Sequence, residues 1–311
     1  MRITLVDPSR TNRMIVTRLL QARGHDVLLF EDAPEALAQM RSDFQIDALI
    51  TSAELTSTSG LELCWETRLL ASSRRPIYIL LMSSNSDRSA LVEALDSGAD
   101  DFIYKPPVAE ELYARLRAAE RIGTLQRELI RLATTDPLTG VSNRRGFFEE
   151  ASEACRQAKR GSSVSAILID IDHFKEVNDL YGHSTGDEAI RAIAREAQTD
   201  EAVVGRLGGD EFSILLKGRS LSAATTIAEG LQRRFAALRL KTPEGLTTLT
   251  CSLGVSELEP NDTVDDLIGR ADLALYKAKE EGRNRVATPP SVSWIRQHPR
   301  KSGAIARAQA R

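Results

Sequence analysis

Residues 202–217 read AVVGRLGGDEFSILLK, and this stretch decides the fold of the region around it. Two runs of branched apolar side chains flank the pair Gly208 and Gly209. A glycine pair between two apolar runs is typical of the tight turn of a β-hairpin, because glycine readily adopts positive backbone φ angles. The hairpin places two carboxylates, Asp210 and Glu211, directly after the turn.

A second apolar run, Val164–Ile171, carries Asp170 near its end and is followed by Asp172. Carboxylates at the point where two neighbouring strands meet can share a hard cation such as Mg²⁺. Residues 173–175 are predicted to open a loop or a helix N-terminus, whose free backbone N–H groups suit phosphate. We therefore expect a metal and phosphate site between Asp170 and the hairpin.

Further polar residues complete the chemistry of this region. Lys175 adds a positive charge, while Lys279 and Arg283 lie four residues apart and are predicted to share one face of the last helix. Asn178 and Asp187 offer the amide and carboxylate pair that the edge of a guanine requires. Taken singly, these features would be an exposed hairpin and a solvated helix face. Together they indicate a phosphoryl- or nucleotidyl-transfer site.

The elements predicted around this site mix strands with helices, as in an α+β sheet that contains antiparallel strands. Strands are expected at Val164–Ile171, Ala202–Leu207, Phe212–Lys217 and Leu246–Val255, and helices at Arg145–Arg160, Asp187–Ala197, Ser222–Leu238 and Asp265–Glu281.

The first 105 or so residues alternate short apolar runs with helical stretches, which is typical of a doubly wound parallel sheet. Strands are expected at Ile3–Val6, Asp26–Phe30, Ala48–Thr51, Ile77–Met82 and Asp101–Tyr104, and helices at Thr11–Ala22, Ala33–Ser42, Gly60–Leu70 and Ser86–Ser97.

A long helix is predicted to start near Val108 and to continue past the needs of one domain. Its apolar stripe has steps of three and four residues, formed by Leu112, Leu116, Ala119, Ile122, Leu125, Leu129 and Leu132. Two successive steps of three break a strict heptad before Ile122. The expected division is a first domain at 1–120, a helical linker at 121–134, a second domain at 135–288 and a basic, disordered tail at 289–311.

Composition excludes several classes of protein. The 311 residues carry a net charge of -3, which provides no general attraction to nucleic acid or to an anionic membrane. No apolar run approaches the roughly 18 residues of a membrane span. The three cysteines have neither metal-ligand nor redox spacing, so buried reduced thiols are expected. These features favour a cytoplasmic protein with no nucleic-acid or membrane partner.

Residues 135–288 resemble a GGDEF domain, the diguanylate cyclase family. Six ordered motifs carry the resemblance: Thr135-Asp136-Pro137-Leu138-Thr139-Gly140 with Asn143-Arg144-Arg145, Asp170-Ile171-Asp172-His173-Phe174-Lys175 with Asn178-Asp179, Tyr181-Gly182-His183 with Gly186-Asp187, Arg206-Leu207-Gly208-Gly209-Asp210-Glu211-Phe212, Ser252-Leu253-Gly254-Val255, and Ala271-Asp272 through Tyr276, Ala278-Lys279 and Gly282-Arg283-Asn284.

The resemblance implies an activity: two GTP molecules are joined into cyclic di-GMP with release of two pyrophosphates. Asp170 and Asp210 would bind Mg²⁺, two ions per GTP, with help from the carbonyl of Ile171. Asp210 or Glu211 would help to deprotonate the attacking 3′-hydroxyl, and Lys175 would assist catalysis. Each domain would bind one GTP, so a homodimer is implied.

The resemblance also implies which residues contact the substrate. Asn178 and Asp187 would read guanine, and an aspartate at position 187 favours guanine on both sides. The implied phosphate contacts and the turn glycines that admit the ligand are His173, Phe174, Lys175, Gly208, Gly209, Lys279 and Arg283.

One departure from the family concerns the inhibitory product site, Arg-x-x-Asp, that precedes the hairpin in many such cyclases. Here the stretch is Thr199-Asp200-Glu201-Ala202, which lacks both residues. An acidic loop without arginine should not hold an anionic dinucleotide, so we expect no product inhibition there. Cyclic di-GMP bound at 199–202 would contradict this expectation.

Residues 1–120 resemble a response-regulator receiver that has lost its phosphorylation chemistry. Asp7 is present, but Pro8 replaces the second acid, and Ser52 stands where the phospho-acceptor aspartate is expected. Ser83 and Lys105 remain. Serine cannot form an acyl phosphate, so we expect a pseudoreceiver that serves dimerisation or binds a protein partner.

The expected fold class is α/β overall: a doubly wound (βα)5 receiver-like domain joined by a long helix to an α+β GGDEF domain of the nucleotide-cyclase-like type. The main alternative to an active enzyme is an inactive GGDEF domain that acts as a nucleotide receptor. A phosphorylation-dependent transcription regulator lacks both the acceptor aspartate and a DNA-binding motif.

Overall fold

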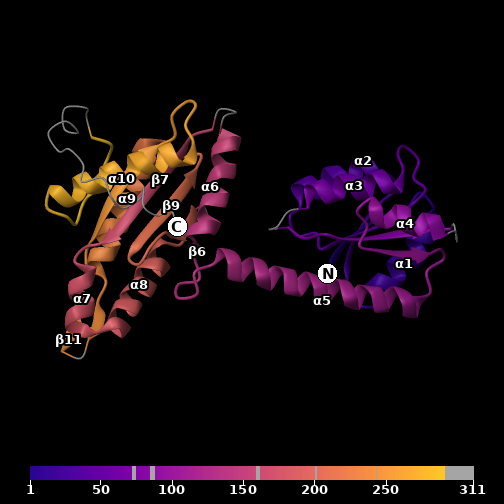
Figure 1. The fold of residues 1–311 in the computed structure, drawn as a ribbon, viewed down its shortest axis with the longest axis horizontal. Helices are drawn as coiled ribbons and strands as arrows, with labels where there is room; N and C mark the ends of the chain where they lie inside the picture. The colour runs from indigo at the N-terminus through magenta and orange to yellow at the C-terminus, as the bar shows by residue number, and fades with distance from the viewer. Residues whose placement is uncertain (72–74, 85–87, 159–161, 200–201, 243, 291–311) are drawn as a thin grey trace. The chain divides into compact units, whose positions relative to one another are not determined.

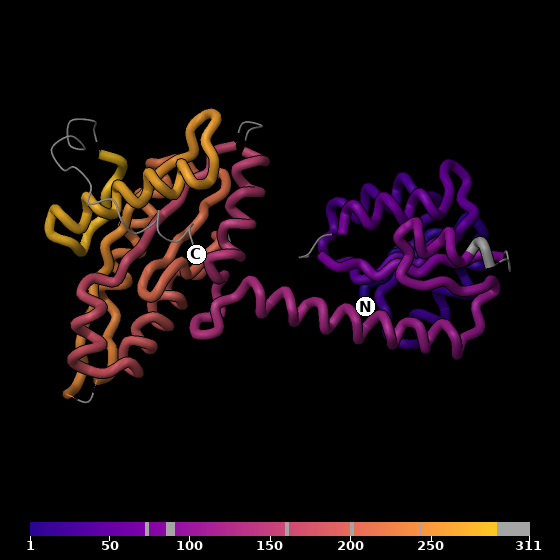
Figure 2. Tube along the Cα trace, in the orientation of Figure 1, coloured from indigo at the N-terminus to yellow at the C-terminus, as the bar shows by residue number. Residues whose placement is uncertain are grey.

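The computed structural model describes residues 1–71, 75–84, 88–158, 162–199, 202–242 and 244–290. The chain divides into two compact units, Met1–Arg131 and Leu132–Arg311 (Figures 1 and 2). Each unit has its own sheet and its own buried core. The basic tail predicted from residue 289 lies outside the described residues from position 291 onward.

The first unit is a parallel sheet with strand order β2-β1-β3-β4-β5. Its elements are β1 (Arg2–Val6), α1 (Arg10–Gln21), β2 (Asp26–Phe30), α2 (Ala33–Ser42), β3 (Ala48–Ser52), α3 (Gly60–Leu70), β4 (Tyr78–Ser83), α4 (Arg88–Asp96), β5 (Asp101–Tyr104) and the start of α5 (Ala109–Thr134). Helices connect strands that pair in parallel, which buries both faces of the sheet. The predicted doubly wound (βα)5 fold is confirmed.

Helix α5 changes its environment along its length. Leu112, Leu116 and Ala119 are buried in the core of the first unit. The later members of the same stripe are exposed in this single chain: Ile122, Leu125, Leu129 and Leu132. From Ile122 onward the steps are three, four and three residues, which is the spacing of a two-stranded coiled coil.

The second unit is a mixed sheet with strand order β13-β12-β7-β9-β8-β6. Its elements are β6 (Ser142–Asn143), α6 (Arg144–Ala158), β7 (Val164–Ile171), α7 (Phe174–Tyr181), α8 (His183–Ala197), β8 (Ala202–Arg206), β9 (Glu211–Lys217), α9 (Leu221–Ala237), β10 (Leu240–Thr242), β11 (Gly245–Thr247), β12 (Cys251–Glu257), α10 (Val264–Glu280) and β13 (Val286–Ala287). The central strand β7 pairs antiparallel with both β9 and β12. The predicted α+β domain is confirmed.

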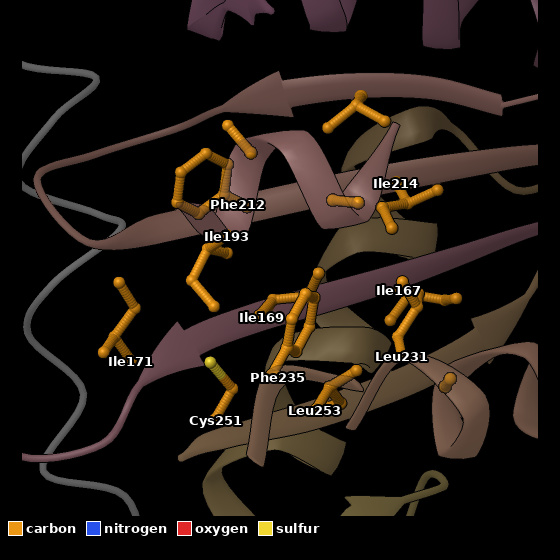
Figure 3. Packing of buried hydrophobic residues seen from close by; sticks show 14 of the residues in the cluster. Ile167, Ile169, Ile171, Ile193, Phe212, Ile214, Leu231, Phe235, Cys251 and Leu253 are labelled. Carbon is orange, nitrogen blue, oxygen red and sulfur yellow. The ribbon is translucent and has the colours of Figure 1, made fainter. Parts of the chain in front are cut away.

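Two cores sandwich this sheet because successive side chains of a strand point to opposite faces. Ile167, Ile169 and Ile171 of β7 pack with α8 and α9, as Figure 3 shows beside Ile193 and Phe235. The alternate positions of β7 pack with α6 and α10: Val164, Ala166 and Leu168. Asp170 continues this second set, so it points to the face that α10 covers.

Some predicted bounds are wrong. The strand expected at Leu246–Val255 is two strands, because β11 pairs with β10 in a separate sheet before β12 joins the main one. Helix α8 starts at His183 rather than Asp187. Of the two expectations for 173–175, a loop or a helix N-terminus, the helix N-terminus is confirmed, because α7 begins at Phe174. Short strands β6, β10 and β13 were not predicted. The ends of the helices predicted at Arg145–Arg160 and Ser86–Ser97 fall partly outside the described residues.

Two further sequence-based expectations concern the cysteines and membrane spans. Cys64, Cys155 and Cys251 are free and buried, as expected. Among the described residues, no helix combines the length and the apolar character that crossing a bilayer requires.

Candidate active site

The Gly208–Gly209 turn is braced by an arginine. Arg206 donates to the Gly209 carbonyl at 2.7 and 3.1 Å and to both carboxylate oxygens of Asp136 at 3.1 and 3.2 Å. Partial burial alone would raise the pKa of Asp136, but hydrogen bonds from Thr139 and Arg206 outweigh it and lower that pKa. The turn is therefore held by an ionised Asp136 some 70 residues earlier in the chain.

The turn itself is open to a ligand. A Cβ atom at Gly209 would meet nothing within 4 Å, while one at Gly208 would lie 3.0 Å from Oε2 of Glu211. The side chain of Glu211 therefore lies close to Gly208, next to backbone that carries no side chain of its own. This is the local geometry that lets a bulky ligand approach the main chain.

Asp170 lies where β7 meets both neighbours, opposite Glu211 of β9 and Ser252 of β12. It is buried, and its Oδ2 lies 2.6 Å from Nζ of Lys279 on α10. Burial raises the pKa of the Asp170 carboxyl; Lys279 opposes this shift, and the charges of Asp210 and Asp172 add to it. Lys279 therefore balances a site with excess negative charge.

Glu211 belongs to the same electrostatic cluster. The pKa of its carboxyl is raised by desolvation and then by the charges of Asp170 and Asp210, while Lys279 opposes the shift. A divalent cation would relieve the repulsion among these three carboxylates, so the donor set fits Mg²⁺. No group of three or more His, Cys, Asp or Glu side chains in the described ranges is placed to hold a metal unaided. Mg²⁺ commonly binds through one or two carboxylates together with water and substrate phosphates.

Helices α7 and α8 bring the predicted base-reading residues together. A Cβ atom at Gly186 would lie 1.9 Å from Oδ1 of Asn178 and 3.2 Å from the ring of Phe174. The missing side chain at Gly186 thus makes room for the Asn178 amide beside Asp187. His173 precedes α7 in a left-handed conformation, and its Nδ1 lies 2.7 Å from Glu176. Lys175 is exposed in the first turn of α7.

Arg283 is not on the last helix, so the prediction of one shared helix face with Lys279 is wrong. Helix α10 ends at Glu280, and Gly282 with a φ of 111° turns the chain away. Arg283 and Asn284 follow with φ of 60° and 47°. Arg283 therefore lies in a turn after α10, where its backbone N–H donates to the Ala278 carbonyl of that helix at 3.0 Å.

Asp172 belongs to the motif that begins at Asp170, and the sequence predicts no role for it. Its buried carboxylate accepts from Thr250 Oγ1 at 2.7 Å, Ser252 Oγ at 2.6 Å and the backbone N–H of Asn284 at 3.0 Å. These partners are 78, 80 and 112 residues away in the chain, so local sequence carries no signal for them.

In the first unit, three residues named from the resemblance to a receiver, Asp7, Ser52 and Lys105, meet. Nζ of Lys105 lies 2.6 Å from Oδ2 of Asp7 and 2.7 Å from Oγ of Ser52. Ser52 also donates to the Glu54 carbonyl at 2.7 Å. Ser83 ends the neighbouring strand β4 and is buried. The lysine is thus already held by the aspartate and the serine.

The expected absence of a product site falls partly on residues 200–201, which lie outside the described residues. The flanking residues that the structure describes are Thr199 and Ala202, and β8 begins at Ala202. Neither flanking residue carries a charge.

Two protein-family models match this chain. Residues 133–285 match the diguanylate cyclase GGDEF domain, and residues 3–117 match the response regulator receiver domain. The chain belongs to the GGDEF family and carries an N-terminal receiver domain.

Individual relatives align with different shares of this chain. The response regulator PleD of Caulobacter vibrioides is 31% identical over 299 residues, which span 92% of this chain and 65% of PleD. Diguanylate cyclase VdcA of Vibrio cholerae is 39% identical over 55% of this chain and 50% of its own length. The chain thus spans less than two thirds of these relatives. The coiled coil and GGDEF domain of DgcB from Caulobacter crescentus, solved with c-di-GMP, matches with a TM-score of 0.53 and 34% identity, over 57% of this chain and 98% of that one.

Proposed function

We propose that this protein is an active diguanylate cyclase, which condenses two GTP into cyclic di-GMP and two pyrophosphates. The observation that carries the proposal is the position of Asp170 opposite Glu211 in the register of β7 and β9, next to the open Gly208–Gly209 turn. Oδ2 of Asp170 also lies 2.6 Å from Nζ of Lys279. An inactive nucleotide receptor has no need to keep this charged cluster intact. The named relatives PleD and VdcA are a response regulator and a diguanylate cyclase, respectively, which supports the same assignment.

Asp170 and Asp210, with the carbonyl of Ile171, would hold Mg²⁺, two ions per GTP. When bound, Mg²⁺ would neutralise charge that develops on the phosphates. Glu211 has a raised pKa and lies beside the turn, so it suits acceptance of a proton from the attacking 3′-hydroxyl. Asp210 is the alternative acceptor.

Separate groups of residues would contact the guanine base and the phosphates of the substrate. Asn178 and Asp187 would hydrogen-bond the guanine edge, and the backbone at 173–175 with Lys175 would meet the phosphates. Lys279 balances Asp170 in the absence of nucleotide; once the cation takes over that role, Lys279 would be free to bind phosphate oxygens with Arg283.

Incubation of the purified chain with GTP and Mg²⁺ tests the proposal, with pyrophosphate release measured and the product identified by chromatography. Cyclic di-GMP as the main product is the expected result. Binding of GTP without pyrophosphate release would establish the receptor alternative instead. A product containing adenine from mixed GTP and ATP would contradict the proposed reading of guanine by Asp187.

Catalysis would need two chains, because each site holds one GTP and the reaction joins two. The exposed stripe Ile122, Leu125, Leu129 and Leu132 has the spacing of a coiled-coil seam, so we include a homodimer in the proposal. Positioning of two bound substrates then supplies much of the rate enhancement.

A Leu125→Asp/Leu129→Asp variant is expected to be monomeric and to lose at least about tenfold in activity at low protein concentration, because charge at seam positions opposes helix pairing. Light scattering gives the oligomeric state and pyrophosphate release the activity. Thr124→Asp, on an exposed position outside the seam, is the matched control and should remain dimeric. A fully active monomeric double variant would refute the dimer requirement.

We further propose that the receiver does not depend on phosphorylation. Lys105, which remains from the receiver pattern, is here bound to Asp7 and Ser52. The receiver fold would then serve dimerisation or bind a protein partner.

Acetyl phosphate should leave the receiver unlabelled, as checked by intact-mass spectrometry, because a serine cannot form an acyl phosphate. The variant Pro8→Asp/Ser52→Asp restores both missing carboxylates and is the positive control. Stoichiometric labelling of the first unit in the unaltered chain would overturn the proposal.

A further inference from the structure

Asp172 connects the central strand to the turn that carries Arg283. It follows β7 directly and is only 5% exposed. Its Oδ2 accepts from the Asn284 N–H at 3.0 Å and from Thr250 at 2.7 Å, while Oδ1 accepts from Ser252 at 2.6 Å. A buried carboxylate that accepts from three donors is well satisfied.

The turn at 282–284 is tied to α10 at its start, where the Arg283 N–H donates to the Ala278 carbonyl at 3.0 Å, and its Asn284 end is held by residues outside α10. Arg283 and Asn284 are both left-handed, a conformation that side chains other than glycine adopt at a cost. Gln232 of α9 donates to the Asn284 carbonyl at 3.2 Å. Asp172 and Gln232 thus hold the N–H and the carbonyl of the same residue, next to Arg283.

Asp172 joins segments that are far apart in the chain. Its carboxylate accepts from Thr250 and Ser252 and from the N–H of Asn284, 112 residues later. It therefore ties the turn to the end of β7 and to the start of β12.

We propose that Asp172 is a positioning residue for substrate binding: it fixes the 282–284 turn so that Arg283 faces the phosphate end of the site. The inference rests on the proposed function, in which Arg283 binds GTP phosphates. Without the hydrogen bond to Asn284, the turn would sample other conformations, and Arg283 would have to be ordered at the cost of binding free energy. In this role Asp172 would act through the turn, because its carboxylate is occupied by Thr250, Ser252 and the Asn284 N–H.

Two measurements on the full chain test the role of Asp172. Hydrogen exchange of the Asn284 amide should be at least about tenfold faster in Asp172→Ala, because its acceptor is lost. Affinity for the α,β-methylene analogue of GTP with Mg²⁺, measured by calorimetry, should fall about tenfold, the order expected for one hydrogen bond to a charged group. Asp172→Asn keeps a carbonyl oxygen for the amide and should recover most of both losses.

Ser256→Ala is the matched control for general destabilisation. Ser256 lies on the same strand as Ser252 and makes a buried 2.7 Å hydrogen bond to the Leu267 carbonyl, away from the turn. This variant should lower thermal stability while analogue affinity stays unchanged. An equal loss of affinity in Ser256→Ala would show that Asp172 acts only through stability and would overturn the proposal.

Coupling to Arg283 gives the sharpest test. If Asp172 acts through that turn, Asp172→Ala/Arg283→Ala should bind the analogue no more weakly than Arg283→Ala alone. Additive losses, or unchanged exchange at Asn284 in Asp172→Ala, would overturn the proposal. Because these readouts are binding and exchange, they are separate from turnover: absent pyrophosphate release in the unaltered chain would refute the proposed activity without altering this result.

Discussion

An Asp170→Asn variant should release pyrophosphate from GTP about a thousandfold more slowly than the unaltered chain, while its fold persists. A metal ion contributes several kcal/mol of charge stabilisation in the transition state, and each 1.36 kcal/mol is a factor of about ten in rate. The amide of asparagine has the shape of the carboxyl group but lacks its charge. Steady-state release of pyrophosphate is the measurement.

The stability of this variant separates loss of charge from loss of structure. The folded-state pKa of Asp170 is raised above its usual value, so its contribution to folding is greatest at low pH and is lost as pH rises through the raised pKa. A neutral asparagine has no carboxylate to keep buried, so this loss of folding stability at neutral pH is absent. Lys279 loses its ion-pair partner in the variant but stays partly exposed to solvent. We therefore expect the thermal midpoint at neutral pH to be unchanged or higher.

Glu229→Gln is the control, because it makes the same charge change at an exposed position on α9. It should leave turnover unaffected. More than a tenth of normal activity in Asp170→Asn would show that this carboxylate does not hold the catalytic metal. A marked fall in its thermal midpoint would contradict the charge-repulsion argument.

Much of this site was predictable from sequence because it depends on strand ends. The strand predicted from the apolar run Val164–Ile171 fixes which side chains share a face, because successive side chains of a strand point to opposite faces. The glycine pair fixes the hairpin that carries Glu211. Asp170 and Glu211 were therefore expected near each other, and the structure places them opposite in register. The residue-by-residue roles remain predictions.

The features that sequence missed depend on weak local patterns or distant contacts. Helix α7 is only eight residues long, Phe174–Tyr181, so its apolar spacing covers too short a stretch to distinguish a helix from a loop. The four-residue spacing of Lys279 and Arg283 suggested one helix, but Gly282 ends α10 between them. The bond from Asp172 to Asn284 spans 112 residues and has no local signature.

A Gly254→Ala variant is expected to destabilise the second unit by at least about 3 kcal/mol, at the upper end of overpacking effects. The added Cβ would lie 2.1 Å from the Ala271 carbonyl oxygen and 2.2 Å from the Leu275 nitrogen, both backbone atoms of α10. Backbone cannot rotate aside as a flexible side chain can, so the whole helix must move away from β12. Because α10 carries Lys279, activity should fall together with stability.

Gly269→Ala on the same helix is the matched control, with an effect expected in the opposite direction. A Cβ there would meet nothing within 4 Å, so the variant should gain about 0.5–1 kcal/mol from lower backbone entropy in the unfolded chain. Hydrogen exchange in β12 is the measurement, because a chain of two units need not unfold in one transition. Slower or unchanged exchange in Gly254→Ala would mean that α10 packs less closely than the structure indicates. If Gly254→Ala exchanges faster and Gly269→Ala slower, the stability of β12 depends on its close contact with α10, the helix that carries Lys279.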